Sequence, residues 1–321
     1  MADYKVVDIE QLETDLASVA DAIRTKGNTT DDLEFPQGFV DGIGAIESGG
    51  GDLPDWDDDS PIIATGKGYV GAGIWELTEK GTMRWVDGIS ANAYFCNSTA
   101  ISVIPLEILD LLPKIRQYYV PDGIQKTELA CAVNCERIRL PYTLNSTPSL
   151  AGLSSLKELD LSNATYTTIP SCGKYTKLER VILSTAFTEI GSYTFEGCYS
   201  LADINLENIT TFKSKCFNEC FGLVDSIAFN PNLVSIESQA FYRTRIKSVK
   251  YQNLVDNLPT IASNAFAQCR ELKAIFCPWA EGAVANAGGG APNATIYYNV
   301  TYDENGNPVD ESGEPIIVEV Q

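Results

Sequence analysis

The chain has 321 residues and a formal net charge of −20, from 43 acidic residues against 23 lysines and arginines. Such an acidic surface repels nucleic acid phosphates, which argues against DNA or RNA as a ligand. The sequence contains no histidine, so Ser-His-Asp and Cys-His nucleophilic sites are excluded. No apolar stretch is long enough to insert into a membrane.

The first expected element is a helix whose apolar residues are spaced three and four apart. These residues are Ile9, Leu12, Leu16, Val19 and Ile23. They form a coiled-coil seam of about two heptads, and so short a helix needs partner helices to be stable. We therefore predict that residues 1–47 are a helical anchor that assembles the chain into a homotrimer. The alternative is that the apolar stripe packs against the rest of this chain.

A Gly- and Asp-rich linker is expected over residues 48–60. It contains the run Asp55-Trp56-Asp57-Asp58-Asp59. Closely spaced carboxylates can ligate Ca²⁺, but such runs are more commonly solvated loops whose charges repel one another. We therefore predict no metal here.

Residues 61–88 are expected to form a β-hairpin region. Gly66, Gly68 and Gly71 match the G-x-G-x-x-G pattern of dinucleotide sites, which needs a helix opening at the glycines. The residues that follow, 73–78, are β formers, and residues 80–81 are a turn signal. The glycines therefore predict a loop before a hairpin, and no cofactor site.

A ragged repeat occupies residues 89–278. One column of the repeat falls at Tyr94, Leu129, Leu150, Cys172, Phe195, Phe217, Phe241 and Phe266. After a long first gap, which residues 106–123 fill with an expected short helix, the spacing is about 22 residues, which is typical of leucine-rich repeats. We predict a mostly β solenoid of eight coils with short parallel strands, in which this column is core.

The clearest coils are the segments 190–201, 236–241 and 261–269. They resemble BspA-type leucine-rich repeats, whose core phrase is I-x-x-x-A-F-x-x-C-x-x-L. The resemblance covers residues 85–280 and implies a recognition surface without conserved chemistry. It also implies two contexts, because this family occurs in bacterial surface adhesins and in phage structural proteins.

The nine cysteines are expected to be free thiols. Cys198, Cys220 and Cys269 share one column of the repeat, where cysteine behaves as a small buried apolar residue. The spacing of Cys131 and Cys135 could suggest a metal, but zinc prefers four ligands and no histidine is available. We therefore predict neither a metal nor a cofactor.

Residues 279–321 are expected to form a C-terminal β-hairpin cap with a long polar loop between strands at 295–300 and 315–320. Asp303, Asn305, Asn307 and Glu314 fall at EF-hand offsets. The glycine that an EF-hand loop requires is replaced by Pro308, and the flanks are β formers rather than helices. The segment therefore predicts a hairpin without calcium.

Two further resemblances bear on the context. Residues 16–39 are similar to N-terminal segments of phage tail and fibre proteins from Gram-positive hosts, and residues 291–299 resemble the closing strand of such chains. Residues 1–8 contain no signal-peptide apolar region. These observations favour a phage protein made in the host cytoplasm and carried in the virion.

We therefore predict a virion structural protein: a tail fibre, head fibre or receptor-binding protein without catalytic residues. Its N-terminus would bind other virion proteins, and its solenoid would bind a host cell-surface glycan or protein. Tyr118, Tyr119 and Tyr242 are the candidates for the ligand surface, because exposed tyrosines stack on sugars or pack on proteins. Two alternatives stay open: a bacterial cell-surface adhesin of BspA type, and a glycan-cleaving enzyme on the same scaffold.

Overall fold

The computed structural model describes residues 56–67, 74–87, 111–119, 134–140, 150, 153–252 and 257–318. All of them belong to one compact unit, Asp55–Gln321. The predicted helical anchor, residues 1–47 with its seam Ile9, Leu12, Leu16, Val19 and Ile23, lies outside the described residues. Two predicted core positions, Tyr94 and Leu129, also lie outside them.

The largest sheet has eight strands in the order β1-β2-β3-β4-β5-β6-β7-β9. Its strands are β1 Ile62–Lys67, β2 Ile74–Thr78, β3 Thr82–Asp87, β4 Gln117–Tyr119, β5 Arg137–Arg139, β6 Glu158–Leu161, β7 Arg180–Leu183 and β9 Asp203–Ile204. The first three strands are antiparallel, and each pair from β3 onward is parallel. The expected hairpin is thus β2–β3, and it continues directly into the repeats.

Two parallel sheets of four strands follow, with orders β14-β12-β10-β8 and β11-β13-β15-β16. Their strands are β8 Glu189–Ile190, β10 Thr211–Phe212, β12 Ser235–Ile236, β14 Thr260–Ile261, β11 Ile227–Ala228, β13 Ser248–Lys250, β15 Ala274–Phe276 and β16 Thr295–Tyr297. A small antiparallel pair, β17 Thr301–Tyr302 and β18 Pro308–Val309, ends the described chain. Of the helix expected within residues 106–123, the described part shows a single 3-10 turn, η3 Leu112–Lys114.

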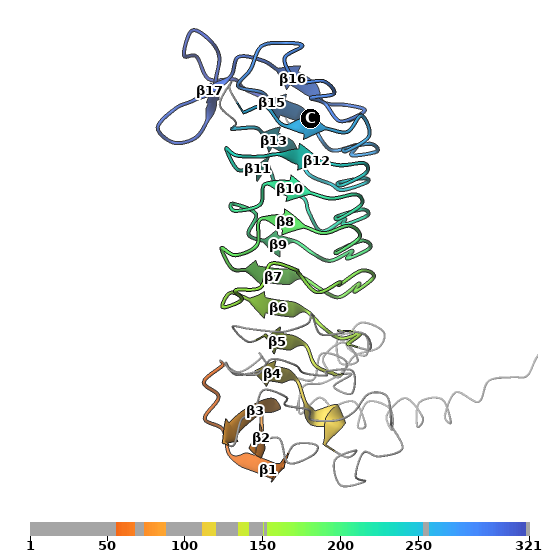
Figure 1. Ribbon diagram of the computed structural model, residues 1–321, viewed down its shortest axis with the longest axis vertical. Coiled ribbons are helices and arrows are strands. Elements are labelled where there is room, and N and C mark those ends of the chain that lie inside the picture. The colour runs from red at the N-terminus through yellow and green to blue at the C-terminus, as the bar shows by residue number, and fades with distance from the viewer. Residues whose placement is uncertain are drawn as a thin grey trace, which may run out of the picture. The chain divides into compact units, whose positions relative to one another are not determined.

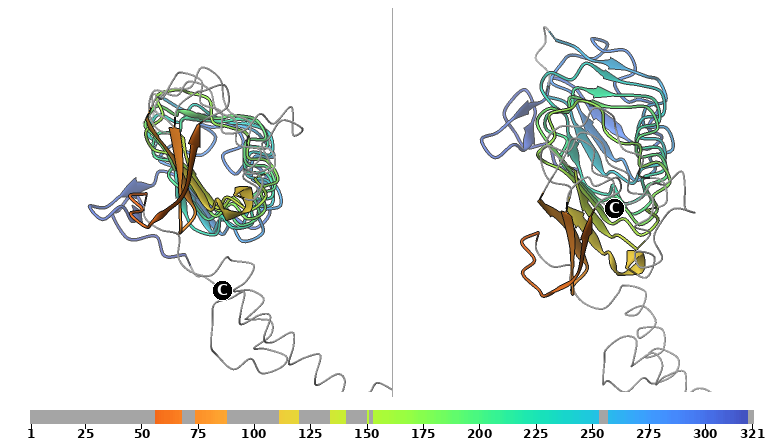
Figure 2. Two further views of the ribbon diagram at one scale, coloured as in Figure 1. Left: turned by 90° about the horizontal axis from the view of Figure 1, so that it is seen from below. Right: turned by 60° about the horizontal axis from the view of Figure 1, so that its bottom comes forward.

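Successive coils lie directly on one another (Figure 1), and they share one outline when viewed along the stack (Figure 2). In the large sheet Gln117 pairs with Arg137, and Arg137 pairs with Glu158. The coil therefore advances by about 20 residues, as repeats of this kind do. The structure confirms a β-solenoid, with about seven turns in the described residues.

The core is a stack of phenylalanines. Phe195, Phe217, Phe241 and Phe266 are fully buried, and neighbouring rings are stacked with centroids 5.3 to 5.4 Å apart. Each ring thus fills the space between the coils above and below it, so no coil buries its apolar face alone.

The coils of Phe195, Phe217 and Phe241 each bend at two positions with positive φ. Lys215 and Glu219 have φ of 57° and 62°, and Gln239 and Arg243 have 56° and 60° in the next coil. This conformation costs an L-residue roughly 1–2 kcal/mol. Hydrogen bonds between coils hold it, such as Lys215 N–H to Ser238 O at 3.1 Å. The bends turn the side chain of Arg243 toward solvent, where it is 51% exposed.

Candidate ligand-binding groove

The repeat places one residue of each coil on an outer edge, four positions after the core phenylalanine. In successive coils these residues are Tyr199, Phe221, Arg245 and Arg270. The rings of Tyr199 and Phe221 stack with centroids 5.2 Å apart, and Tyr199 is 45% exposed. The edge therefore carries an aromatic surface that continues into a pair of arginines.

A groove opens beside this edge, with a volume of about 400 Å³. It is lined mainly by Phe221, Tyr242, Arg243, Arg245, Arg270 and Glu271. Its volume falls within the range of small-molecule sites, about 300–1,000 Å³. We call it the aromatic–arginine groove.

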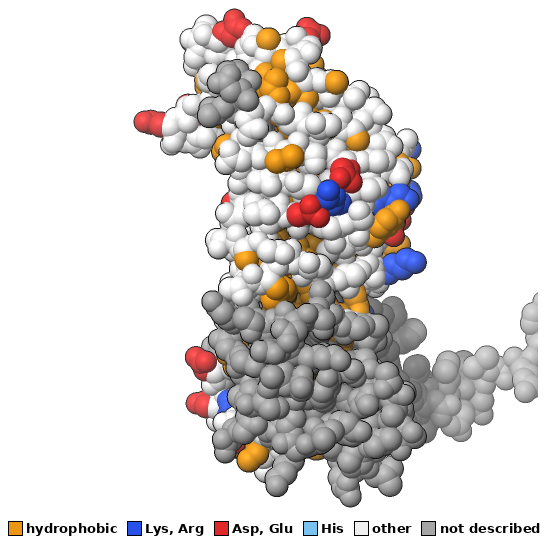
Figure 3. All heavy atoms as spheres, viewed as in Figure 1, with side chains coloured by type: hydrophobic (Ala, Val, Ile, Leu, Met, Phe, Trp, Pro, Cys, Tyr) orange, Lys and Arg blue, Asp and Glu red, His pale blue; other side chains and the backbone are white. Residues whose placement is uncertain are grey.

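The groove is locally positive in a chain whose net charge is −20. Arg243 pairs with Glu219 at 2.6 Å, Arg245 pairs with Glu271 at 2.7 Å, and Arg270 donates to the Gln268 amide at 3.2 Å. Three guanidinium groups thus face two carboxylates. Figure 3 shows Lys and Arg side chains beside apolar ones along one edge of the described solenoid. The groove therefore favours an anionic ligand.

The ion pairs of the groove are exposed and can exchange partners. The side chains of Arg243 and Arg245 are 51% and 55% exposed. Pairs this exposed contribute roughly 0–1 kcal/mol to stability. A ligand carboxylate can therefore replace the protein carboxylate at little cost, and the guanidinium fork can bind it with two hydrogen bonds.

The three tyrosines predicted for a ligand surface lie in three different environments. Tyr242 lines the groove. Tyr119 is partly buried, with its ring 6.2 Å from that of Trp56. Tyr118 corrects the expectation: it is 2% exposed and lies in the core, where its hydroxyl accepts the Trp85 indole N–H at 2.8 Å. The reason is strand alternation, because Tyr118 pairs in register with the buried Ile138.

Sequence reasoning missed Phe221 and the three arginines of the groove. Their signal was present in the repeat, because all but Arg243 occupy the position four after the core phenylalanine. Reading the outward columns in the same way as the inward column would have found them. The exposed position of Arg243 depends on its positive φ, which the sequence does not reveal.

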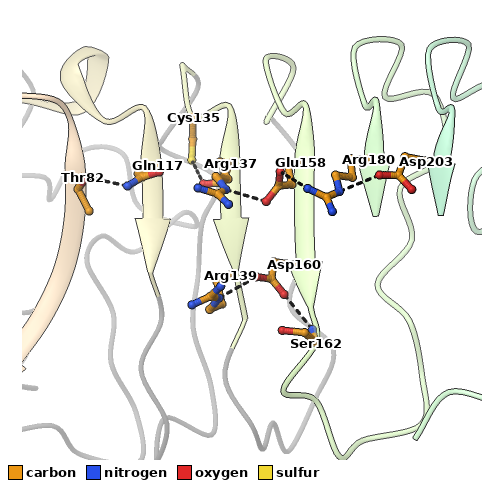
Figure 4. A network of polar contacts seen from close by, with 10 residues as sticks. All are labelled: Thr82, Gln117, Cys135, Arg137, Arg139, Glu158, Asp160, Ser162, Arg180 and Asp203. Carbon is orange, nitrogen blue, oxygen red and sulfur yellow. Dashed lines mark hydrogen bonds and ion pairs between the residues drawn. The ribbon is translucent and has the colours of Figure 1, made fainter. Parts of the chain in front are cut away.

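The outer face of the large sheet carries a polar ladder that is mostly satisfied within the protein (Figure 4). One row runs from Arg137 to Glu158 at 2.6 Å, then through Arg180 at 3.8 Å to Asp203 at 2.9 Å. Because Arg137 and Glu158 are only 19% and 15% exposed, this part of the ladder holds neighbouring coils together rather than offering groups to a ligand.

A second row of this ladder joins Arg139 to Asp160 at 2.7 Å. The ring of Trp56 covers this part of the face, with its centroid 4.2 Å from the Arg137 guanidinium and 4.6 Å from that of Arg139. Such cation–π contacts contribute about 0.5–1 kcal/mol or more when desolvated. Trp56, expected in the linker, thus lies against the repeats.

The family model for the BspA type leucine rich repeat region matches six copies, over residues 123–226 and 149–273. This region belongs to the BspA-type leucine-rich repeat family. The residues that line the groove, from Phe221 to Glu271, all lie within the matched residues.

Two solved structures are similar to the chain. A leucine-rich repeat protein from Bacteroides ovatus is 15% identical, with a TM-score of 0.32, and the match covers 75% of this chain and 76% of that one. A leucine rich cell surface protein from Faecalibacterium prausnitzii is 13% identical, with a TM-score of 0.25, and covers 74% and 95%. No curated protein matches the sequence.

The acidic run before the BspA-type region is partly buried. Asp58 is 4% exposed and accepts hydrogen bonds from Ser60 N–H at 3.0 Å, the Thr78 hydroxyl at 2.6 Å and the Thr82 hydroxyl. Burial alone would raise the pKa of this carboxyl, but the hydrogen bonds outweigh it and lower the pKa from 3.8 to about 2. Asp58 therefore anchors its segment to the β2–β3 hairpin. The sequence predicted a solvated loop here, and for Asp58 that prediction was wrong.

We expect Asp58→Asn to lower the free energy of unfolding at pH 7 by about 1–2 kcal/mol, because it loses charge-assisted hydrogen bonds. The native pKa lies below the unfolded value of 3.8, so the stabilisation is present above about pH 4 and is lost as pH falls toward 2. Urea unfolding between pH 7 and pH 2 measures both effects. The matched control is the exposed neighbour, Asp57→Asn; equal effects of the two changes would contradict the anchor.

The cysteines of the described residues are buried free thiols. They are Cys135, Cys172, Cys198, Cys216, Cys220, Cys269 and Cys277. Burial raises the pKa of the Cys135, Cys198 and Cys277 thiols to about 12, so they stay protonated at neutral pH. Within the described residues, no group of three potential ligand side chains could hold a metal ion. Because burial raises these pKa values, the thiolate form that binds metal ions is disfavoured.

The C-terminal segment differs from the expected hairpin. The strand at 295–297 is β16, which pairs in parallel with β15 and extends the solenoid. The hairpin is the shorter β17–β18 pair, and residue 315 adds a single bridge. The carboxylate of Asp303 accepts backbone N–H bonds from Asn305 and Asn307, which makes it a turn-forming residue. Within the described part of the chain, no helix has the length and hydrophobicity needed to cross a membrane.

Proposed function

We propose that this chain is a recognition protein of the BspA adhesin type, which binds its ligand in the aromatic–arginine groove and performs no reaction on it. One observation carries the proposal: a ligand-sized, locally positive groove on the outer edge of a BspA-type repeat. Solenoids of stacked repeats create extended binding surfaces of this kind. The rigid Phe195–Phe217–Phe241 core beneath holds the groove residues in place before the ligand arrives.

The adhesin alternative is better supported than the virion role that the sequence favoured. Nothing in the comparisons links the chain to phage tail or fibre proteins. Residues 1–47, which carry most of the resemblance to phage proteins, lie outside the described residues. The homotrimer, the virion location and the contact with other virion proteins stay predictions.

The groove favours binding over glycan cleavage. Glycosidases use a pair of carboxyl groups on either side of the scissile bond. Among the described residues that line the groove, Glu271 is the single carboxylate, and it is paired with Arg245. This arrangement supports a site that holds a sugar or another ligand without cleaving it.

The test is the binding of labelled full-length chain to a panel of bacterial cells and host extracellular matrix. We expect the double variant Phe221→Ala/Arg245→Ala to bind at least about tenfold more weakly to any surface that the wild type binds. The control is Tyr193→Ala/Arg180→Ala, which removes an exposed aromatic residue and an exposed arginine elsewhere on the solenoid. Unchanged binding by the groove variant, or release of reducing sugar from the bound surface, would contradict the proposal.

A further inference from the structure

We infer that the aromatic–arginine groove selects a carboxylate-bearing carbohydrate, such as a polymer of uronic acids. The inference rests on the proposed function and adds the chemical class of the ligand. It follows from three features of the groove: its aromatic rings at the surface, its guanidinium groups in exchangeable ion pairs, and its backbone N–H groups, which are already hydrogen-bonded.

The rings offer flat apolar faces at the protein surface. Phe221 lines the groove, and Tyr199 extends it along the same edge in a stacked arrangement. Tyr242 adds a third ring one coil farther on. Aromatic rings bring a large contact area at a small entropic cost, because they have few rotatable bonds. Rings displayed in this way suit the C–H faces of sugar rings.

The guanidinium groups determine the sign and geometry of the ligand charge. Arg243 and Arg245 already bind carboxylates, those of Glu219 and Glu271. Arg270 donates to a neutral amide, and the described residues give it no carboxylate partner. A uronate carboxylate would thus meet one arginine that lacks a counter-ion and two that bind this same group in the free protein.

The backbone around the groove has little to offer a peptide. The N–H groups of Tyr242, Arg243 and Arg245 donate to Gln239 O, Ala267 O and Leu223 O. A peptide that binds by adding a strand to a sheet edge depends on free main-chain hydrogen-bond groups. Because these donors are occupied, strand addition is disfavoured and recognition here relies on side chains. The rings beside the arginines then favour a carbohydrate over an acidic peptide.

The test measures binding of the full-length chain to three soluble polymers by isothermal titration calorimetry. Polygalacturonate is the probe, its fully methyl-esterified form has the same sugars without the charge, and poly-glutamate has the charge without the sugars. We expect polygalacturonate to bind at least about tenfold more tightly than either comparison polymer. We also expect its binding to weaken as salt is added, because the charges involved are exposed.

Variants assign the binding to the groove. Arg243→Gln/Arg245→Gln and Phe221→Ala should each weaken polygalacturonate binding by about tenfold or more. Arg243→Lys keeps the charge but loses the planar fork, so it should lie between wild type and Arg243→Gln. Arg180→Gln is the matched control, since its side chain is also 51% exposed and paired with carboxylates, on another face.

Each outcome decides between the ligand class and the proposed function. The inference is overturned if polygalacturonate does not bind, if its methyl ester or poly-glutamate binds equally well, or if Arg180→Gln weakens binding as much as the groove variants. If groove variants still lose cell or matrix binding in that case, the recognition function stands with another ligand. If they keep that binding, the recognition function fails as well.

Discussion

Phe217→Ala should lower the free energy of unfolding by about 3–5 kcal/mol, the usual cost of removing a fully buried phenylalanine. The ring is fully buried and stacks on Phe195 at 5.3 Å and on Phe241 at 5.4 Å. Its removal leaves a cavity that opens toward both neighbours. Because stability in a stack is shared between adjacent coils, the damage should spread to the coils of Phe195 and Phe241.

Denaturant unfolding measures the loss of stability, and amide hydrogen exchange measures its spread. The control is Phe221→Ala, a partly exposed phenylalanine in the same coil, which should cost much less. Full protection from exchange in the coils of Phe195 and Phe241, despite a destabilised Phe217 coil, would contradict shared stability.

Arg139→Ala should cost about 3 kcal/mol, because removing one partner of a buried ion pair leaves an uncompensated charge. Its partner Asp160 has a side chain only 2% exposed, and the pair is 2.7 Å apart. Burial alone would raise the pKa of Asp160, but hydrogen bonds from Ser162 and the charge and hydrogen bond of Arg139 outweigh it and lower this pKa. The lowered pKa shows that the native protein stabilises the ionised form.

The sign of the pH dependence follows from that shift. Because the native pKa of Asp160 lies below its unfolded value, its stabilisation is present above about pH 4 and fades as pH falls through the native pKa. The difference between wild type and Arg139→Ala should therefore shrink below pH 4. Chemical unfolding from pH 7 to pH 2 measures it.

The matched control is Arg137→Ala, on the same strand and also under the Trp56 ring. Glu158 would keep Arg180 as a partner, and it is 15% exposed. We therefore expect a cost of about 1 kcal/mol for Arg137→Ala. Equal costs for the two arginines would show that the Trp56 contact, which both changes remove, matters more than the buried pair.

The sequence by itself determined which residues face the core of this solenoid. A column of apolar residues at a spacing of about 22 residues requires stacked coils, because no coil can bury that column alone. The same pattern indicated short strands, and the β formers and turn signal after residue 72 indicated a hairpin within residues 61–88, where the structure has β2 and β3. It also explained Cys198, Cys220 and Cys269 as core residues, and all three are fully buried.

Only the tertiary structure decided which residues meet at the surface. Whether Tyr118 faces core or solvent depends on the register of a three-residue strand, and a shift of one residue reverses it. The groove needs side chains from coils about 22 residues apart and a bend at Arg243 with positive φ. The burial of Asp58 depends on hydroxyl groups 20 and 24 residues away. The apolar periodicity is a property of the sequence, whereas these polar contacts join residues that meet only after the coils have stacked.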